Sequence, residues 1–378
     1  MLRIDVAVIG TGAIGAAATW RLAERGVGVT AFERFAPGHS FGSSHGDTRL
    51  FREACLEHPD LVAMAQSSRA LFRELERLSG DELLTITGGV SIGAEDSDAV
   101  AGAVRAAEAA SLAIEHLSAA EVRARFPQHA DVADTDVGVL DPAAGVARPE
   151  RTVRAAAAAA STRGARIVTG TTVTAVEPGP SGVTIRTADA VWTADRVIVA
   201  AGAWLPAFAP WLDLTPVRTP LTWFTPRDAG FDIADYPVTI RQVDAGTVMW
   251  GHGSIDGSLV KLGLGDLWGT ERPRIDPDAV DRGVTPADWS RLSPLVERVL
   301  PGLEPVPTRV EPCMITISPD DQFVIGAAPE SDRVLVAGGD SGHAFKHCLA
   351  LGEVLARDAV GEAQELELDF VRPARLTG

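Results

Sequence analysis

Short hydrophobic runs that stop at glycines recur along the chain. Residues 6–9 form an apolar run that ends at a glycine cluster, and the apolar periodicity from 14 to 24 predicts a helix. A second apolar run follows at 27–32, after Gly26. This order of strand, helix and strand is typical of a parallel sheet that is covered by helices.

Two further apolar runs, far along the chain, have the same form. Residues 197–200 lead to Gly202, and residues 334–337 lead to Gly338. Strands of a parallel sheet end in this way where the sheet meets a bound ligand. We therefore expect both runs to be strands of the sheet that begins at residues 6–9.

The middle of the chain has a different pattern. Apolar and polar positions alternate between 215 and 264, which predicts antiparallel strands, whereas residues 95–128 are charged and predicted to be helical. No low-complexity linker separates the two patterns, so we expect two interleaved domains in an α/β (α+β overall) fold. The predicted nucleotide-binding domain comprises residues 1–80, 146–215 and 310–378, and the predicted antiparallel-sheet substrate domain comprises residues 81–145 and 216–309.

The first glycine cluster has the spacing G-x-G-x-x-G, formed by Gly10, Gly12 and Gly15. The first glycine allows a tight turn, the second lets a pyrophosphate approach the backbone, and the third lets the helix pack closely on the strand. Ala13 and Ile14 begin the predicted helix, whose free N–H groups would face the phosphates. The cluster thus predicts a Rossmann-like dinucleotide site.

Glu33 ends the next predicted strand, about 20 residues beyond the glycines. A carboxylate at this place accepts a hydrogen bond from a ribose hydroxyl and repels a 2′-phosphate, which favours FAD or NAD over NADP. The glycine-rich turn at 338–342 precedes a second predicted helix, at 343–360, and supplies a second anion site. A flavin needs positive charge beside its N1 and C2=O atoms as well as a pyrophosphate cradle, so the two sites together favour FAD.

Composition narrows the classes of partner. The 378 residues are 46% hydrophobic and 22% charged, which is typical of globular proteins, and the net charge of −17 argues against nucleic acid and anionic membrane. No apolar run reaches membrane-spanning length, and three cysteines are too few for a disulfide framework, so we expect a cytoplasmic protein. His343 and His347 have a metal-like spacing, but no third ligand lies near them in the sequence, and we expect no metal.

Three separate segments carry a resemblance to a known family. Residues 42–49 read GSSHGDTR, residues 312–316 read PCMIT, and residues 341–346 read SGHAFK. In this order, over essentially the whole chain, they resemble the monomeric sarcosine oxidase family, which includes N-methyltryptophan oxidase and other covalent-flavin amine oxidases. The resemblance implies a two-domain flavoprotein that oxidises the C–N bond of an N-alkyl amino acid and passes the electrons to oxygen, which leaves as hydrogen peroxide.

Cys313 matches the family's flavin-linking cysteine, which bonds through sulfur to the 8α-methyl group of FAD. Without this match, a cysteine between Pro312 and Met314 would most often be a small buried hydrophobic residue. Cys55 and Cys348 lack the motif, and we expect them to serve packing only. The predicted cofactor-binding residues are Gly10, Gly12, Ala13, Ile14, Gly15, Glu33, Arg34, Ser43, Ser44, Arg49, Val173, Gly202, Trp204, Cys313, Met314, Gly342 and Lys346.

Of the 34 basic residues, only Lys261 and Lys346 are lysines. An ammonium group is compact and can change its protonation when buried, unlike a guanidinium group. By the resemblance, Lys261 matches the oxygen-activating lysine, whose charge stabilises developing superoxide. Lys346 matches a lysine that holds the substrate carboxylate, and Arg52 matches its two-pronged partner. His45 and Arg49 match basic residues that lie against the flavin ring.

The chain departs from the family at the substrate pocket. Where the family's sarcosine oxidases have Lys-Leu-Gly-Tyr-His, this chain has Gly265 at the position of the histidine. Ile315 and Trp250 stand at the positions of two pocket tyrosines, and the only tyrosine, Tyr236, lies outside the motifs. We therefore expect a more apolar pocket that accepts a bulkier or cyclic amine in preference to sarcosine.

The sequence thus predicts a monomeric enzyme that binds FAD covalently and acts on an amino acid or imino acid with O2. The substrate carboxylate is expected on Arg52 and Lys346, with its neutral nitrogen over the flavin. Three alternatives stay open. They are a cyclic imino acid oxidase in a biosynthetic pathway, an NAD-dependent dehydrogenase with an unmodified Cys313, and a non-catalytic flavin-binding protein.

Overall fold

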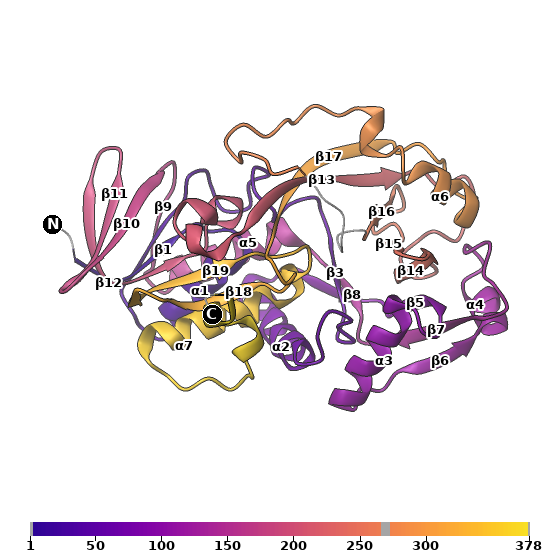
Figure 1. Ribbon diagram of the computed structural model, residues 1–378, viewed down its shortest axis with the longest axis horizontal. Helices are drawn as coiled ribbons and strands as arrows, with labels where there is room; N and C mark the ends of the chain where they lie inside the picture. The colour runs from indigo at the N-terminus through magenta and orange to yellow at the C-terminus, as the bar shows by residue number, and fades with distance from the viewer. Residues whose placement is uncertain (1–2, 266–272, 377–378) are drawn as a thin grey trace.

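The chain folds into two halves, each built on its own eight-stranded sheet, in a computed structural model that describes residues 3–265 and 273–376. Figure 1 shows helices packed on the sheet of one half and mostly strands in the other. This arrangement confirms the predicted α/β (α+β overall) fold class.

The first sheet contains β1 (Arg3–Ile9), β2 (Val29–Phe32), β9 (Arg166–Val168), β10 (Val173–Gly179), β11 (Gly182–Thr187), β12 (Val191–Val199), β18 (Val324–Ala328) and β19 (Ser331–Gly338). Its main path is β10-β11-β12-β1-β2-β9, and β19 pairs with both β12 and β18. The central pairs are parallel, whereas β10, β11 and β12 form an antiparallel meander. The four runs predicted to share a sheet are β1, β2, β12 and β19, so that prediction is confirmed.

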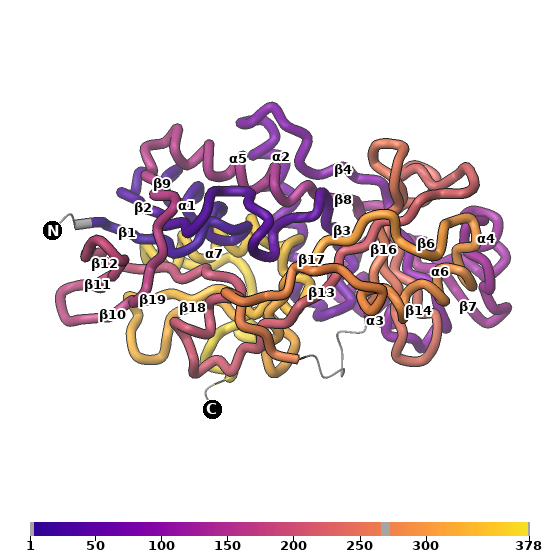
Figure 2. Tube along the Cα trace, turned by 90° about the horizontal axis from the view of Figure 1, so that it is seen from above, coloured from indigo at the N-terminus to yellow at the C-terminus, as the bar shows by residue number. Residues whose placement is uncertain are grey.

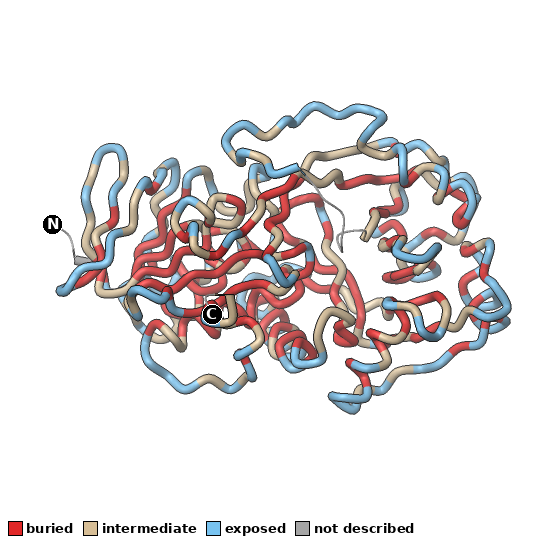
Figure 3. Tube along the Cα trace, viewed as in Figure 1, coloured by how far each residue is buried: buried red, intermediate tan, exposed pale blue. Residues whose placement is uncertain are grey.

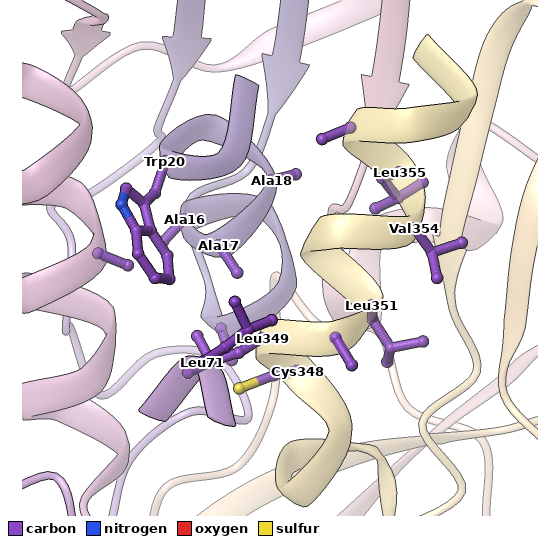
Figure 4. Packing of buried hydrophobic residues seen from close by; sticks show 14 of the residues in the cluster. Ala16, Ala17, Ala18, Trp20, Leu71, Cys348, Leu349, Leu351, Val354 and Leu355 are labelled. Carbon is purple, nitrogen blue, oxygen red and sulfur yellow. The ribbon is translucent and has the colours of Figure 1, made fainter. Parts of the chain in front are cut away.

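Four longer helices belong to this half: α1 (Ala13–Glu24), α2 (Leu61–Ser79), α5 (Pro149–Thr162) and α7 (Cys348–Val360). Small residues bring α1 and α7 together, since a Cβ on Gly352 would lie 2.4 Å from the Cβ of Ala17 (Figure 4). Both helices follow glycine turns, so their close packing also places the two turns in one region. Figure 3 shows that the buried residues concentrate in this half.

The second sheet runs in the order β17-β13-β16-β15-β14-β5-β7-β6. Its strands are β5 (Gly89–Ala94), β6 (Glu115–Ser118), β7 (Asp136–Asp141), β13 (Thr215–Phe224), β14 (Val238–Asp244), β15 (Thr247–His252), β16 (Val260–Leu264) and β17 (Arg309–Ile317). The predicted antiparallel pairing holds among β13, β14, β15 and β16. However, β5 joins β14 in parallel, because a strand from elsewhere in the chain completes the sheet.

The helical prediction for 95–128 is wrong in its middle. The segment forms α3 (Asp98–Ala110) and α4 (Ala119–Arg125), with the edge strand β6 between them. Leu117 is the only buried residue of β6, so the strand is too short to show an alternating pattern. Its strand conformation depends on pairing with β7, which the local sequence does not specify. The remaining helix of this half, α6 (Ser293–Val299), lies near β16.

The chain crosses between the halves several times. A small sheet of β3 (Arg49–Phe51), β8 (Gly145–Ala147) and β4 (Leu84–Ile86) lies between them. The long pair β13 and β17 extends from one half into the other (Figures 1 and 2). The predicted domain boundaries stay a prediction. Within the described parts of the chain, no helix has the length and apolar character needed to cross a membrane.

Candidate functional site

The turn from β1 into the first residues of α1 contains two glycines, Gly10 and Gly15, that larger residues could not replace. Gly10 has a φ of +90°, and a Cβ there would lie 2.6 Å from the carbonyl oxygen of Ala200. A Cβ on Gly15 would lie 1.9 Å from the carbonyl oxygen of Gly10. At Gly12 the nearest atom to such a Cβ is the hydroxyl of Ser44, 3.7 Å away. Open space therefore remains at the N-terminus of α1, where a phosphate is best stabilised.

Glu33 is buried at the end of β2 and ties that strand to the glycine turn. Its Oε2 accepts hydrogen bonds from the backbone N–H and the hydroxyl of Thr11, at 2.8 and 2.9 Å. Its Oε1 accepts one from the backbone N–H of Phe35 at 2.8 Å. Because a carboxylate oxygen can accept about two hydrogen bonds, Oε1 can accept one from a ribose hydroxyl, in competition with His39 Nε2, which lies 3.5 Å away.

A cavity of about 350 Å³ extends from the first glycine turn to the second. Most of the predicted cofactor-binding residues line it, although they come from segments far apart in the chain. They are Gly10, Gly12, Ala13, Ile14, Glu33, Arg34, Ser43, Ser44, Arg49, Val173, Gly202, Trp204 and Gly342. Gly15, Cys313, Met314 and Lys346 do not line this cavity. Its long path past the helix N-terminus and Glu33 suits a dinucleotide such as FAD.

Phe35, which was not predicted from the sequence, lines the cavity near the end of β2 together with the predicted Trp204. Phe35 stacks on Phe41 with ring centroids 4.6 Å apart, and the guanidinium of Arg34 lies 5.5 Å from the ring centroid of Trp204. Asp278, from the segment after β16, accepts a hydrogen bond from Trp204 Nε1 at 2.7 Å and pairs with Arg34. Arg34 and Asp278 are 244 positions apart, so only the fold brings them together.

The carboxyl group of Asp340 accepts backbone hydrogen bonds that stabilise the second glycine turn. Gly339, Ser341 and Gly342 have φ values of 63°, 43° and 81°. Asp340, within this turn, accepts hydrogen bonds from the backbone N–H groups of Thr316 and Gly342, at 3.1 and 3.0 Å. Burial raises the pKa of Asp340 to about 6. The anion site predicted here therefore contains a titratable acid, and the N–H of Gly342 is directed toward that acid.

The predicted helix after this turn begins later than expected. A short 3₁₀ segment, η4 (Ala344–His347), precedes α7. This segment carries Lys346 into the interior, where its side chain is 3% exposed. The turn and the 3₁₀ segment thus position a buried cation that a regular helix from residue 343 would place differently.

Cys313 is buried on β17, beside the wall of the cavity. Its Sγ lies 3.7 Å from Arg49 Nη2 and 3.8 Å from the carbonyl oxygen of Ser43, and both of these residues line the cavity. Burial raises the pKa of the Cys313 thiol, and the positive charge of Arg49 opposes that rise. The next residue, Met314, is also buried on the strand.

Lys261 is buried on β16 under the loop that precedes β3. Its Nζ donates hydrogen bonds to the carbonyl oxygens of Gly46 and Thr48, at 2.6 and 2.8 Å. The same nitrogen lies 4.8 Å from the ring centroid of Trp223. Burial lowers the pKa of Lys261 well below its ordinary value, and the nearby Arg49 lowers it further.

Two buried histidines flank this lysine. His252 Nδ1 donates to the carbonyl oxygen of Gly253 at 2.7 Å, so its Nε2 accepts from the hydroxyl of Thr48 at 2.8 Å. His45 Nδ1 lies 3.6 Å from a carboxylate oxygen of Glu311. Burial lowers the pKa of His45 and of His252 to about 4, so both rings are neutral near pH 7. Sequence reasoning missed His252, whose place opposite Lys261 follows only from the strand register.

Arg52 and Lys346 meet on one buried carboxylate. Arg52 Nη2 and Lys346 Nζ donate to the same oxygen of Glu57, at 2.8 and 2.9 Å. Burial alone would raise the pKa of Glu57, but the two cations hold that pKa well below its ordinary value. Sequence reasoning paired Arg52 with Lys346 and missed Glu57, which is separated from Lys346 by 289 positions.

Two residues that depart from the family pattern, Trp250 and Ile315, place apolar side chains on β15 and β17 of the second sheet. The indole of Trp250 lies across Gly263, where a Cβ would be 2.2 Å from the ring, and Trp250 Nε1 donates to the carbonyl oxygen of Leu264 at 3.1 Å. Ile315 lines the cavity. Trp250 also packs against a hydrophobic cluster that includes Cys313. Tyr236 is buried elsewhere, with its ring 5.2 Å from that of His129.

The fold and the cavity define the class, which is an α/β protein whose Rossmann-like sheet presents a dinucleotide site. The chain belongs to the FAD dependent oxidoreductase family, which matches residues 5–357, and its cofactor is therefore FAD. The predicted family resemblance is confirmed by two relatives. Over 98% of its length the chain is 34% identical to a monomeric sarcosine oxidase from Streptomyces avermitilis, covering 97% of that protein. Over 98% of its length it is also 29% identical to an N-methyl-L-tryptophan oxidase from Yersinia pestis (strain Pestoides F), covering 99% of that protein.

Solved structures share the fold. The chain resembles NikD, described as an unusual amino acid oxidase essential for nikkomycin biosynthesis, with a TM-score of 0.84 and 24% identity over 99% of this chain and 98% of that one. It also resembles a glycine oxidase from Geobacillus kaustophilus, with a TM-score of 0.80 and 20% identity over 99% of both chains.

Proposed function

We propose that this protein is an oxidase of secondary amino acids, which converts their C–N bond to an imine and reduces O2 to hydrogen peroxide. The names of the two relatives support the amine oxidase class, and the family supplies FAD. The observation that carries the proposal is the meeting of Arg52 and Lys346 on the single carboxylate of Glu57. Two buried cations that share one anion can accept a second carboxylate by exchange.

One N–H donor of the Arg52 side chain has no acceptor among the described residues. This donor is Nε, and the side chain is only 11% exposed. A buried N–H without a partner costs free energy until a ligand satisfies it. In the proposed complex, the substrate carboxylate replaces Glu57 as the partner of Arg52 and shares Lys346 with Glu57.

FAD, when bound in the cavity, supplies the two-electron acceptor that passes the electrons on to oxygen. The substrate loses two electrons and two protons as its imine forms, and O2 gains two electrons and two protons as hydrogen peroxide forms. We assign the half with the first sheet to FAD and the half with the second sheet to the substrate. Lys261 holds the positive charge that stabilises developing superoxide, with His45 and Arg49 close by.

The proposal includes a thioether between Cys313 and the 8α-carbon of FAD. It would form as the S–H bond and one C8α–H bond break, with the two electrons taken up by the flavin and then by O2. The position of Sγ beside Arg49 and Ser43, both of which line the cavity, supports it. Acid-precipitated protein should stay yellow, and its intact mass should exceed that of the chain by one FAD less two hydrogen atoms. The variant Cys313→Ala should release its FAD on precipitation. A colourless wild-type pellet, with free FAD in the supernatant, contradicts the covalent bond.

The substrate is proposed to be a bulkier or cyclic apolar secondary amine. Ile315 and Trp250 provide apolar surface, and a Cβ on Gly265 would meet no atom closer than 3.5 Å. Each added methylene that becomes buried contributes about 0.8 kcal/mol, which corresponds to about fourfold in kcat/KM.

Peroxide release on sarcosine, N-methyltryptophan, proline and pipecolate at equal concentrations tests this choice. The larger amines should have higher kcat/KM than sarcosine. The highest kcat/KM on proline or pipecolate would favour the alternative function, a cyclic imino acid oxidase. The highest efficiency on sarcosine would contradict the argument from the apolar pocket. Absence of peroxide with all four amines, together with turnover by NAD, would contradict the oxidase assignment itself.

A further inference from the structure

The side-chain nitrogen of Lys261 is buried without a carboxylate partner among the described residues. Its side chain is 2% exposed, and its two hydrogen bonds go to the neutral carbonyl oxygens of Gly46 and Thr48. Among the residues that the structure describes, no Asp or Glu forms an ion pair with it. Burial of an unpaired charge is costly and ordinarily drives a lysine to its neutral form. To act as a cation near oxygen, Lys261 therefore needs a neighbouring group that stabilises its charged form.

Trp223 is the aromatic residue in contact with this ammonium. It lies on β13, directly opposite Lys261 in the strand register, and is 4% exposed. The Lys261 Nζ is 4.8 Å from its ring centroid. An indole attracts cations to its electron-rich face more strongly than the other aromatic rings do, and the attraction grows when the pair is removed from water.

We propose that Trp223 is the positioning residue that stabilises the charged form of Lys261 in place of a counter-ion, so that its full positive charge stays available for oxygen. The inference rests on the proposed oxygen-activating role of Lys261. A carboxylate at this place would stabilise the ammonium equally well, but it would also cancel the field that favours developing superoxide. An indole face stabilises the cation and adds no net negative charge.

Among the described residues, the charged groups near Lys261 provide no ion pair that would stabilise its ammonium form. Arg49 disfavours the ammonium, whereas Asp47 and Glu150 favour it without forming an ion pair with it. The flanking rings of His45 and His252 are neutral near pH 7, because burial lowers the pKa of each to about 4.

A second cation contacts the same indole. The guanidinium of Arg309 lies 4.2 Å from the ring centroid of Trp223. Arg309 is 39% exposed and pairs with both Asp47 and Glu311, so its charge is already compensated. Lys261 depends on the indole more strongly than Arg309 does, since Lys261 is buried and forms no ion pair with the described residues.

The presence of only two lysines allows a direct test. Holoenzyme labelled with 13C at the lysine ε-carbon should give two side-chain signals, and the variant Lys261→Met assigns them. The midpoint of the Lys261 titration should fall by about one pH unit in Trp223→Leu and by less in Trp223→Phe, which retains a weaker aromatic face. The Lys346 signal, which reports a lysine paired with Glu57, is the internal control and should stay the same.

The rate at which O2 reoxidises the reduced enzyme gives the second measurement. In Trp223→Leu the pH above which this rate declines should move down together with the Lys261 midpoint, whereas anaerobic reduction by the amine should change little. Unchanged Lys261 midpoints in both Trp223 variants would overturn the inference. If the midpoint moves but Lys261→Met reoxidises normally, the proposed oxygen role is wrong while Trp223 still stabilises the ammonium.

Phe126→Leu is a matched control, because it removes a cation–π contact with Arg125, 6.0 Å from the ring, at the far end of the second sheet. It should leave both lysine signals unchanged. A shift of the Lys261 midpoint in this control as large as that in Trp223→Leu would attribute the effect to general loosening of the sheet, and would contradict the inference.

Discussion

The two lysines of this chain lie in opposite electrostatic environments. Lys346 is paired with the carboxylate of Glu57 at 2.9 Å, and Arg52 shares that carboxylate at 2.8 Å. Lys261 is paired with carbonyl oxygens and the face of an indole. A carboxylate partner can be exchanged for another carboxylate, whereas a neutral partner leaves the charge in place. The partner of a buried cation therefore indicates whether that cation serves ligand exchange or serves as a constant source of positive potential.

The largest expected effect comes from removing the uncompensated charge. Lys261→Met keeps the side-chain length, and reoxidation by O2 should slow by several orders of magnitude, because the charge beside developing superoxide is lost. Anaerobic reduction of the flavin by the amine should change much less. Stopped-flow measurement of the two half-reactions separates them. Equal losses in both halves would show that the two lysines do not differ in role.

Removing a cation from the compensated site should affect binding instead. Arg52→Ala should weaken substrate binding by tens-fold or more, since losing one partner of a desolvated charge pair costs about 2–5 kcal/mol. Titration with a non-reacting carboxylate analogue, followed by the flavin spectrum, measures this directly. The matched change at the other lysine, Lys346→Met, should weaken the same analogue and leave reoxidation near the wild-type rate. Slow reoxidation in Lys346→Met would remove the distinction between the two sites.

Removing the carboxylate of Glu57, which Arg52 and Lys346 share, should strengthen substrate binding. Glu57→Gln keeps the shape but deletes the charge that competes with the substrate, so the carboxylate analogue should bind about tenfold more tightly. Glu57→Gln should not affect binding of a neutral amide analogue of the same size, which is the control ligand. Weaker binding of the carboxylate analogue would show that Glu57 orients Arg52 and Lys346 and does not compete with the substrate.

The smallest effect concerns stability in acid. The pKa of Glu57 is held well below its ordinary value of 4.5, so its contribution to stability is complete above that value and is lost as the pH falls through the folded-state pKa. Thermal unfolding should show wild type losing more stability than Glu57→Gln between pH 5 and more acidic buffers. Parallel pH profiles for the two proteins would indicate that the two cations do not stabilise the carboxylate.

Much of the cofactor cavity could be predicted from the sequence, because each part depends on a short local pattern. The spacing of Gly10, Gly12 and Gly15 predicts a glycine turn, and the structure gives the steric reason at Gly10 and Gly15 and open space at Gly12. The four apolar runs ending at glycines predicted the parallel core of the first sheet. By contrast, the edge strand β6 was missed, since Leu117 alone marks its buried face.

The electrostatic partners could not be predicted in this way. Glu57 carries no motif, and its importance follows from contact with Lys346 across 289 positions. Lys261 was identified by the rarity of lysine and by family resemblance, but neither revealed Trp223. The pairing of these two residues follows from the register between β13 and β16, which is set by hydrogen bonding between distant strands.

The sequence by itself determined the cofactor class, the kind of fold and the two places where the chain retains an ammonium group. These properties follow from glycine sterics, hydrophobic periodicity and side-chain chemistry, all of which act locally. Only the tertiary structure decided which neighbour each cation has, which is Glu57 for Lys346 and the Trp223 ring for Lys261. The physical reason is that burial and electrostatic pairing depend on distances in space, which are set when strands and helices far apart in the chain pack together.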